Sequence, residues 1–96
     1  MTQNMSEDNP FSEYRFTPST DLNGERNEAR LISKHLKNPD RVVLELGGNV
    51  GRASVVIGSK LRQSTNHVVV EPGDVSVLNA NLKLNHLHSC VVNAAI

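Results

Sequence analysis

Two short segments of this 96-residue chain contain the residues that could bind a ligand. Residues 42–51 (VVLELGGNVG) run from an apolar stretch into a glycine-containing turn, and residues 68–71 (VVVE) end an apolar stretch on a carboxylate. Apolar runs of this kind are typical of buried parallel strands. In α/β folds, the ribose of an adenosine-bearing cofactor is bound by one arrangement of elements: a strand, a glycine turn, a helix and a second strand that ends in an acid.

The glycines of the first segment follow the spacing Glu45-x-Gly47-x-x-x-Gly51. Gly47 stands where the backbone must turn at the strand end, and Gly51 where the next helix packs closely on the strand. The amides of Gly48, Asn49 and Val50 are expected to point into the crevice beyond the strand, beside the positive end of that helix. A carboxylate or a phosphate could bind there.

The spacing argues against two other nucleotide sites. The dinucleotide fingerprint requires G-x-G-x-x-G, but Asn49 occupies the place of its second glycine. The phosphate loop requires G-x-x-x-x-G-K-[ST], whereas Gly47 and Gly51 are one residue too close and Arg52-Ala53 follows them. We therefore expect neither NAD or FAD nor a hydrolysed nucleoside triphosphate.

Glu71 supplies the second half of the predicted site. A carboxylate at the end of a strand can accept two charge-assisted hydrogen bonds from a ribose diol. Taken alone, Glu71 could equally end a strand beside the Pro72-Gly73 turn. Together with the glycine spacing, it favours an adenosine-bearing cofactor.

These residues resemble a known family. The segment VVLELGGNVGRAS resembles motif I of class I S-adenosylmethionine-dependent methyltransferases. Residues 68–96 are similar to the next segment of the FkbM subfamily, in which Glu-Pro ends a strand and the following helix carries Leu-x-x-Asn-x-x-x-Asn, here Leu78, Asn81 and Asn85. The resemblance covers about residues 40–96.

The resemblance implies S-adenosylmethionine as the cofactor and assigns roles to seven residues. Glu45 and the turn formed by Gly47, Gly48, Asn49 and Gly51 would hold the methionine part, Glu71 the ribose hydroxyls, and Pro72 would lie near the adenine. Many family members have Asp where Glu45 stands, so contact with the cofactor's amino group could differ here.

The predicted fold class is α/β, a partial Rossmann-like methyltransferase sheet. Three parallel strands joined by crossover helices are expected within residues 24–96, preceded by a helix and by a polar, irregular segment over residues 1–23. The three helices are predicted over residues 25–37, 52–63 and 74–87, the last with Asp74 as N-cap. Predicted inward-facing residues are Ala29, Ile32, Leu36, Ala53, Val56, Ile57, Leu61, Val75, Leu78 and Leu82, and Gly58 is expected to pack closely against a strand.

Class I methyltransferases have seven strands, whereas this chain contains three. We therefore expect a fragment, or a remnant that a partner completes, with the apolar residues 42–46 open to solvent. A missing C-terminal half or a partner chain would complete the sheet.

Composition limits the partners and the setting. Ten basic and ten acidic residues cancel, so nucleic acid is not an expected partner, and no apolar run approaches the ~20 residues of a membrane span. One cysteine, Cys90, favours a reducing, cytoplasmic setting and is expected to be a small buried strand residue.

No metal site is predicted, because His86, His88 and Cys90 lack a fourth ligand nearby in the sequence. His35 and His67 are expected to have ordinary surface or helix-end roles.

Two surface features each allow two interpretations. Phe11, Tyr14 and Phe16 are the only aromatic residues; they either dock onto a surface that this chain lacks or cover a local apolar spot, and the second is favoured. The stripe of Arg30, Lys34 and Lys37 is expected to be a solvated helix face rather than a contact with RNA or with an acidic partner.

Two functions follow from these observations. The first is a methyltransferase that methylates a hydroxyl of a sugar or of another small molecule, with catalytic residues that this chain does not reveal. The alternative is a non-catalytic, methyltransferase-like component of a larger assembly.

Overall fold

The computed structural model describes residues 9–95 and alternates helices with strands. In chain order the elements are α1 (Arg26–His35), β1 (Val43–Leu46), α2 (Arg52–Lys60), a short 3₁₀ helix (Ser64–Asn66), β2 (His67–Val70), α3 (Ser76–Leu84) and β3 (Cys90–Val92). Apolar runs became strands and apolar residues at helical spacing became helices, because each places its apolar side chains on one packed face.

The three strands form one parallel sheet in the order β1-β2-β3. Leu46 at the end of β1 pairs with Val70, and Val70 pairs with Val92 at the end of β3. This confirms the predicted α/β class with three parallel strands. Because the strands are parallel, their carboxyl ends meet at one edge, where the loops after β1 and β2 lie side by side.

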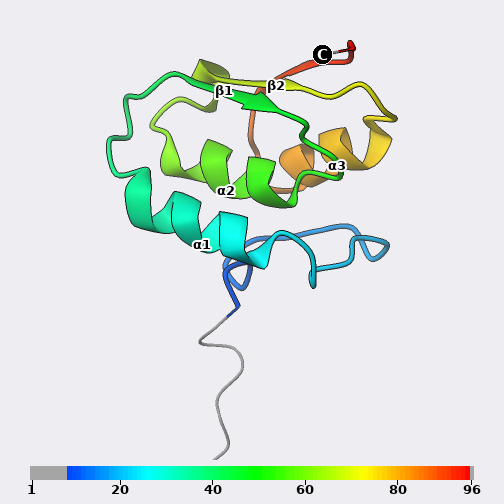
Figure 1. Ribbon diagram of the computed structural model, residues 1–96, viewed down its shortest axis with the longest axis horizontal. Coiled ribbons are helices and arrows are strands. Elements are labelled where there is room, and N and C mark those ends of the chain that lie inside the picture. The colour runs from blue at the N-terminus through cyan, green and yellow to red at the C-terminus, as the bar shows by residue number, and fades with distance from the viewer. Residues whose placement is uncertain (1–8, 96) are drawn as a thin grey trace, which may run out of the picture.

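All three helices lie on the same side of the sheet (Figure 1). α2 and α3 pack directly beneath it, and α1 packs on α2 on the side away from the strands. The first core cluster, Val55, Val69, Leu78 and Leu82, fills the space between the sheet and these two helices. Within the part of the chain that is described, no helix has the length and apolarity that crossing a membrane requires.

Two neighbouring valines of α2 face different layers. Val55 joins the cluster beneath the sheet, whereas Val56 packs with Ala29 of α1 and with Phe11. The prediction that Val56 faces the sheet was therefore wrong. The sequence pattern offered no way to choose, because α2 is covered on two sides and both valines are fully buried.

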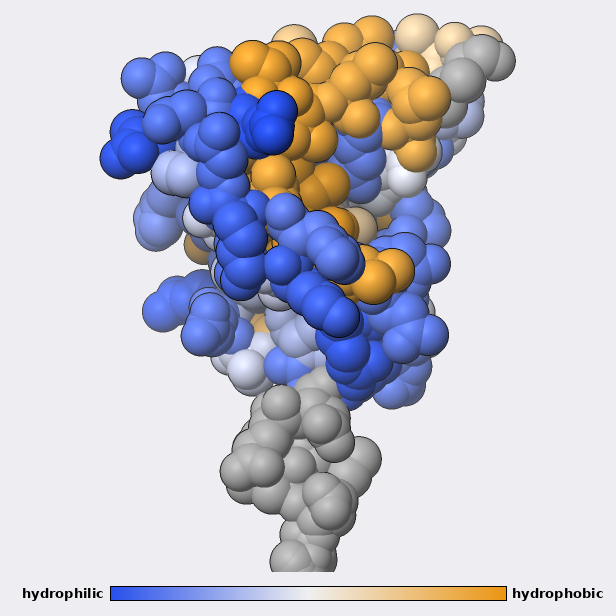
Figure 2. All heavy atoms as spheres, turned by 60° about the vertical axis from the view of Figure 1, so that its left-hand side comes forward, coloured by the Kyte–Doolittle hydropathy of each residue, from blue (hydrophilic) through white to orange (hydrophobic). Residues whose placement is uncertain are grey.

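The other face of the sheet is open. Val42, Leu44 and Leu46 are 77, 63 and 59% exposed, as expected for residues 42–46. On the same face of the sheet, Val92 of β3 is also exposed, and Figure 2 shows a continuous apolar area at this end of the molecule. We call this surface the open face. Parallel sheets are normally covered on both faces, whereas helices cover only one face of the sheet described here.

Residues 9–25 contain no helix or strand, as predicted for the irregular segment; its first eight residues lie outside the described part. Phe11 is nevertheless fully buried against Ala29 and Val56, and its ring meets that of Phe16 edge-on with centroids 5.6 Å apart. The aromatic residues thus cover an apolar spot on this chain's own helices, which was the favoured of the two interpretations.

The helix ends depart slightly from the predictions. α1 ends at His35, which is exposed at the helix end as expected. α3 begins at Ser76, so the N-cap position belongs to Val75 rather than to the predicted Asp74. The Asp74 carboxylate instead accepts hydrogen bonds from the amide and the hydroxyl of Ser76 (2.8 and 2.7 Å), which lowers the pKa of Asp74.

Candidate functional site

The turn between β1 and α2 is left-handed at three positions. Gly47, Asn49 and Gly51 have φ values of 81°, 56° and 95°. Glycine adopts such values freely, and asparagine does so more readily than most residues. Asn49 therefore fits the turn although it stands where a dinucleotide site would require glycine.

The turn is packed tightly from below and is open at its start. A Cβ at Gly48 would lie 2.4 Å from Val69 Cγ1, and one at Gly51 would lie 2.9 Å from Leu78 Cδ1. A Cβ at Gly47 would meet no atom within 4 Å. The sheet and α3 thus hold the main chain in place, and the space beside Gly47 remains free for another molecule.

Glu71, the first residue after β2, lies against this turn. Its carboxylate accepts the Asn49 amide on Oε1 at 2.7 Å and the Gly73 amide on Oε2 at 2.8 Å. The Asn49 bond and then the Gly73 bond lower the pKa of Glu71, so it is ionised at neutral pH. A carboxylate offers roughly four lone-pair positions, and two of them remain for a ligand hydroxyl pair.

The start of α2 adds further donors at the same edge. Its N-cap is Gly51, which has no side chain to cap the first turn. The first amides of a helix lack partners within the helix and attract anions. The turn and the Glu71 carboxylate therefore lie together at the carboxyl ends of β1 and β2, and α2 begins directly after the turn. We call this region the crevice.

One further residue stabilises this crevice, and the sequence analysis did not predict it. Asn93, directly after β3, donates through Nδ2 to the carbonyl oxygens of Glu71 and Gly73, each at 2.7 Å. It closes the Glu71-Pro72-Gly73 turn from the far side, with Pro72 exposed at its tip. A polar residue just after the third parallel strand was the available signal, because all three strand ends share this edge.

Glu45 is the one predicted site residue whose side chain is directed elsewhere. It lies on the helix-facing side of β1, and its Oε1 is 2.9 Å from Nε2 of His67. His67 is fully buried, and its Nδ1 lies 2.8 Å from Ser89 Oγ. The expectation of a surface or helix-end role for His67 was wrong, because its partners are 22 residues away in each direction along the chain.

The Glu45–His67–Ser89 array joins all three strands. Glu45 lies on β1, His67 on β2, and Ser89 immediately precedes β3. An acid, a histidine and a serine in this order also occur in nucleophilic catalysis, but here α2 covers them closely. A Cβ at Gly58 would lie 3.1 Å from Ser89 Oγ and 3.6 Å from His67 Nδ1. We interpret the array as a structural link, and the expected close packing of Gly58 is confirmed.

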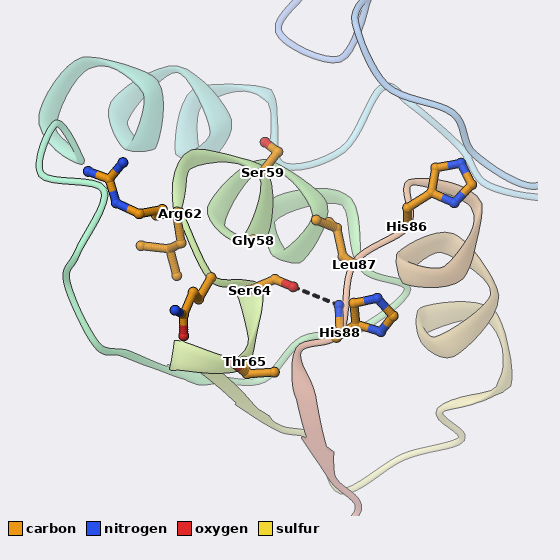
Figure 3. Close-up of a pocket in the computed structure, with 10 residues that line it drawn as sticks. Gly58, Ser59, Arg62, Ser64, Thr65, His86, Leu87 and His88 are labelled. Atoms are coloured by element: carbon orange, nitrogen blue, oxygen red, sulfur yellow. Dashed lines mark hydrogen bonds between the residues drawn. The ribbon is translucent and has the colours of Figure 1, made fainter.

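The opposite end of the sheet contains a second hollow (Figure 3). It has a volume of about 400 Å³ and is lined by polar residues that include Arg62, Ser64, Thr65, His86 and His88. The rings of His86 and His88 point in different directions, and the His88 amide donates to Ser64 Oγ at 2.7 Å. Within residues 9–95 no three His, Cys, Asp or Glu side chains are grouped closely enough to hold a metal ion.

Cys90 departs from its prediction. It begins β3 on the open face and is exposed, whereas a buried strand position was expected. Strand residues alternate between the two faces of a sheet, and only the helix-facing set is covered here.

Comparisons with protein-family models, with curated proteins and with solved structures gave no match.

Proposed function

We propose that this chain forms the cofactor-binding part of an S-adenosylmethionine-dependent methyltransferase. The observation that supports this most directly is the 2.7 Å contact between the Asn49 amide in the glycine turn and the Glu71 carboxylate. An adenosine-bearing ligand requires the turn and the acid to face the same crevice.

The residues at this crevice fit such a cofactor. The free space beside Gly47 suits the methionine part, and the uncapped start of α2 suits its carboxylate. The ionised Glu71 would accept the ribose hydroxyls and Pro72 would lie near the adenine. Glu45 would act from beneath through its hydrogen bond to His67.

The bound cofactor would supply a methyl group on a sulfonium centre. The residues of this chain would hold and orient that group rather than react with it, because alignment of the donor with the acceptor supplies much of the rate. The proposed acceptor is a hydroxyl of a sugar or of another small molecule. The single cysteine fits a cytoplasmic setting for this enzyme.

The open face enters the same proposal. Its exposed leucines and valines would be covered by further helices, from another segment of the protein or from a partner chain, and the free edge of β1 would accept another strand.

Titration calorimetry with S-adenosylhomocysteine tests the cofactor proposal, supported by NMR shifts of the Asn49 and Gly73 amides. Glu71→Gln keeps the shape of the side chain but removes its charge, and we expect at least a roughly tenfold loss of affinity from the weakened charge-assisted bonds. Gly47→Val should abolish binding, because a β-branched residue does not tolerate a φ of 81° and would fill the free space.

Glu28→Gln is the matched control, since Glu28 is an exposed acid on α1, which packs away from the sheet. It should bind as the parent chain does. A folded parent chain whose Asn49 and Gly73 amides do not shift with the ligand would contradict the cofactor proposal.

The second candidate is a non-catalytic component of an assembly, and the open face favours it. It predicts no response to S-adenosylhomocysteine, together with an association that depends on Leu44 and Leu46. The two readouts separate the candidates, because the crevice and the open face involve different side chains.

A further inference from the structure

A groove runs between the N-terminal segment and α3, away from the crevice. It has a volume of about 670 Å³, within the usual range of ~300–1,000 Å³ for ligand pockets. We call it the basic groove. Its lining residues are Arg15, Phe16, Thr17, Pro18, Ala80, Lys83, Leu84 and His86.

The walls of the basic groove are tied together by side-chain amides. Asn85 accepts the Arg15 amide at 2.9 Å and donates to the Arg15 carbonyl oxygen at 2.7 Å. The buried Asn81 accepts the Thr17 amide at 2.8 Å and donates to Thr20 Oγ1 at 3.0 Å. These bonds fix the N-terminal segment on α3, so the groove exists before any ligand arrives.

The charges around the basic groove have one sign. Arg15, Lys83 and His86 line it, and no acidic residue does. Among the residues that the structure describes, ion pairs join Arg52 to Glu25 and Arg62 to Asp40, and a hydrogen bond joins His67 to Glu45. None of the three groove residues takes part in these contacts, so the charges of Arg15 and Lys83 are available to an anion.

The floor is apolar. Phe16, Pro18, Ala80 and Leu84 contribute to it, and Leu84 is 40% exposed although it lies on a packed helix. A ligand that fits both features must carry negative charge and an apolar group.

His86 occupies an unusual backbone position. It follows α3 with a φ of 57°, a conformation that glycine usually supplies at a helix end. Figure 3 shows its side chain directed away from His88 and toward the N-terminal segment. The helix end thus places an imidazole at the rim of the groove where glycine would leave only backbone.

We propose that the basic groove binds an acidic peptide segment in which an aliphatic or aromatic residue lies between carboxylates. The apolar side chain would cover Phe16 and Leu84. The flanking carboxylates would pair with Arg15 on one wall and with Lys83 on the other, and an arginine can hold a carboxylate through two parallel bonds.

The experiment is an NMR titration of the 96-residue chain with three synthetic probe peptides. The first is acetyl-Glu-Leu-Glu-Phe-Glu-amide, the second replaces Glu by Gln, and the third replaces Leu and Phe by Ser. We expect saturable shifts at Ala80 and Leu84 with the first peptide and at least roughly tenfold weaker binding of the other two, since each lacks one of the two complementary features.

Variants of the chain locate the contact. Arg15→Glu and Lys83→Glu should each weaken binding of the first peptide at least about tenfold, because each places a repelling charge at the rim. Lys34→Glu makes the same charge change on the exposed side of α1 and should bind as the parent does. Leu44→Thr with Leu46→Thr, remote on the open face, provides a second background in which self-association does not obscure the result.

Several outcomes would overturn the proposal. Equal binding of the neutral or the serine peptide would remove the charge or the apolar part of the argument. Shifts caused by oligouridylate but not by the acidic peptide would assign the groove to nucleic acid. If the acidic peptide caused no shifts in the parent chain or in the Leu44→Thr, Leu46→Thr variant, the groove would not be a binding site for such a peptide. None of these outcomes depends on the cofactor crevice.

Discussion

The Glu71 carboxylate depends on residues from three loops. Asn49 and Gly73 donate to it, while Asn93 holds the carbonyl groups on either side of Pro72. The acid that would bind the ribose is therefore oriented by a residue that makes no contact with the carboxylate itself.

Asn93→Ala should raise the pKa of Glu71 toward the ordinary glutamate value, because the turn that presents the Gly73 amide is no longer braced. The pKa of Glu71 is lower in the folded chain than the ordinary glutamate value. Its two hydrogen bonds therefore stabilise the fold fully at a pH above the ordinary pKa, and this stabilisation is lost as the pH falls through the lowered pKa. In the variant, the pKa values of Glu71 in the folded and the unfolded chain lie closer together. The free energy of unfolding should therefore fall less than in the parent chain when the pH is lowered.

NMR titration of the Glu71 side-chain carbon measures this change without any cofactor. Asn79→Ala, an exposed position on α3, is the matched control and should leave the pKa of Glu71 unchanged. An unaltered pKa in Asn93→Ala would show that the turn holds its shape unaided. If the crevice binds S-adenosylhomocysteine, the same variant should also bind it several-fold more weakly.

At the scale of the elements, the buried array is the feature that local patterns concealed. His67 stands at the start of an apolar run, and nothing adjacent to it indicates that Glu45 and Ser89 are its partners. The parallel register places His67 opposite Val43, so that its ring reaches along the sheet to the next helix-facing residue of β1.

His67→Ala should lower the free energy of unfolding by about 3–5 kcal/mol, because it leaves a largely buried carboxylate at Glu45 without its partner. Adding Glu45→Gln to His67→Ala should restore part of this loss, since a neutral amide is less costly to bury. Urea unfolding of the two single variants and the double variant gives the coupling energy. Strictly additive losses would mean that the two side chains do not stabilise one another.

The sequence predicted the strands, the parallel class and the inward residues of α1 and α3, because apolar periodicity depends on neighbours that are close along the chain. Six of the seven predicted site residues lie at one edge of the sheet for the same reason, since the end of a strand determines where its turn lies, and their role in binding stays a prediction. The sequence analysis missed the orientation of Glu45, the partners of His67, the exposure of Cys90 and the brace from Asn93. Each of these depends on which side of the sheet is covered or on contacts between distant segments.

At the scale of the whole molecule, the open face sets the solution behaviour. A large exposed apolar surface beside an unpaired strand edge promotes association. Leu44→Thr with Leu46→Thr keeps residues that favour strands and removes much of this surface, so the chain should shift toward the monomer in sedimentation velocity.

Leu84→Thr serves as the control, because Leu84 is an exposed leucine on α3 and lies outside the open face. It should leave the distribution unchanged. A parent chain that sediments as a monomer at all concentrations would contradict a role of the open face in association.

The glycine turn lies at the free edge of β1, so the crevice has one wall in this chain and would receive the other from whatever pairs with that strand. Strand pairing and cofactor binding are then thermodynamically linked. If a partner raises the affinity of the chain for the small molecule by a given factor, then the bound small molecule must raise the affinity for that partner by the same factor.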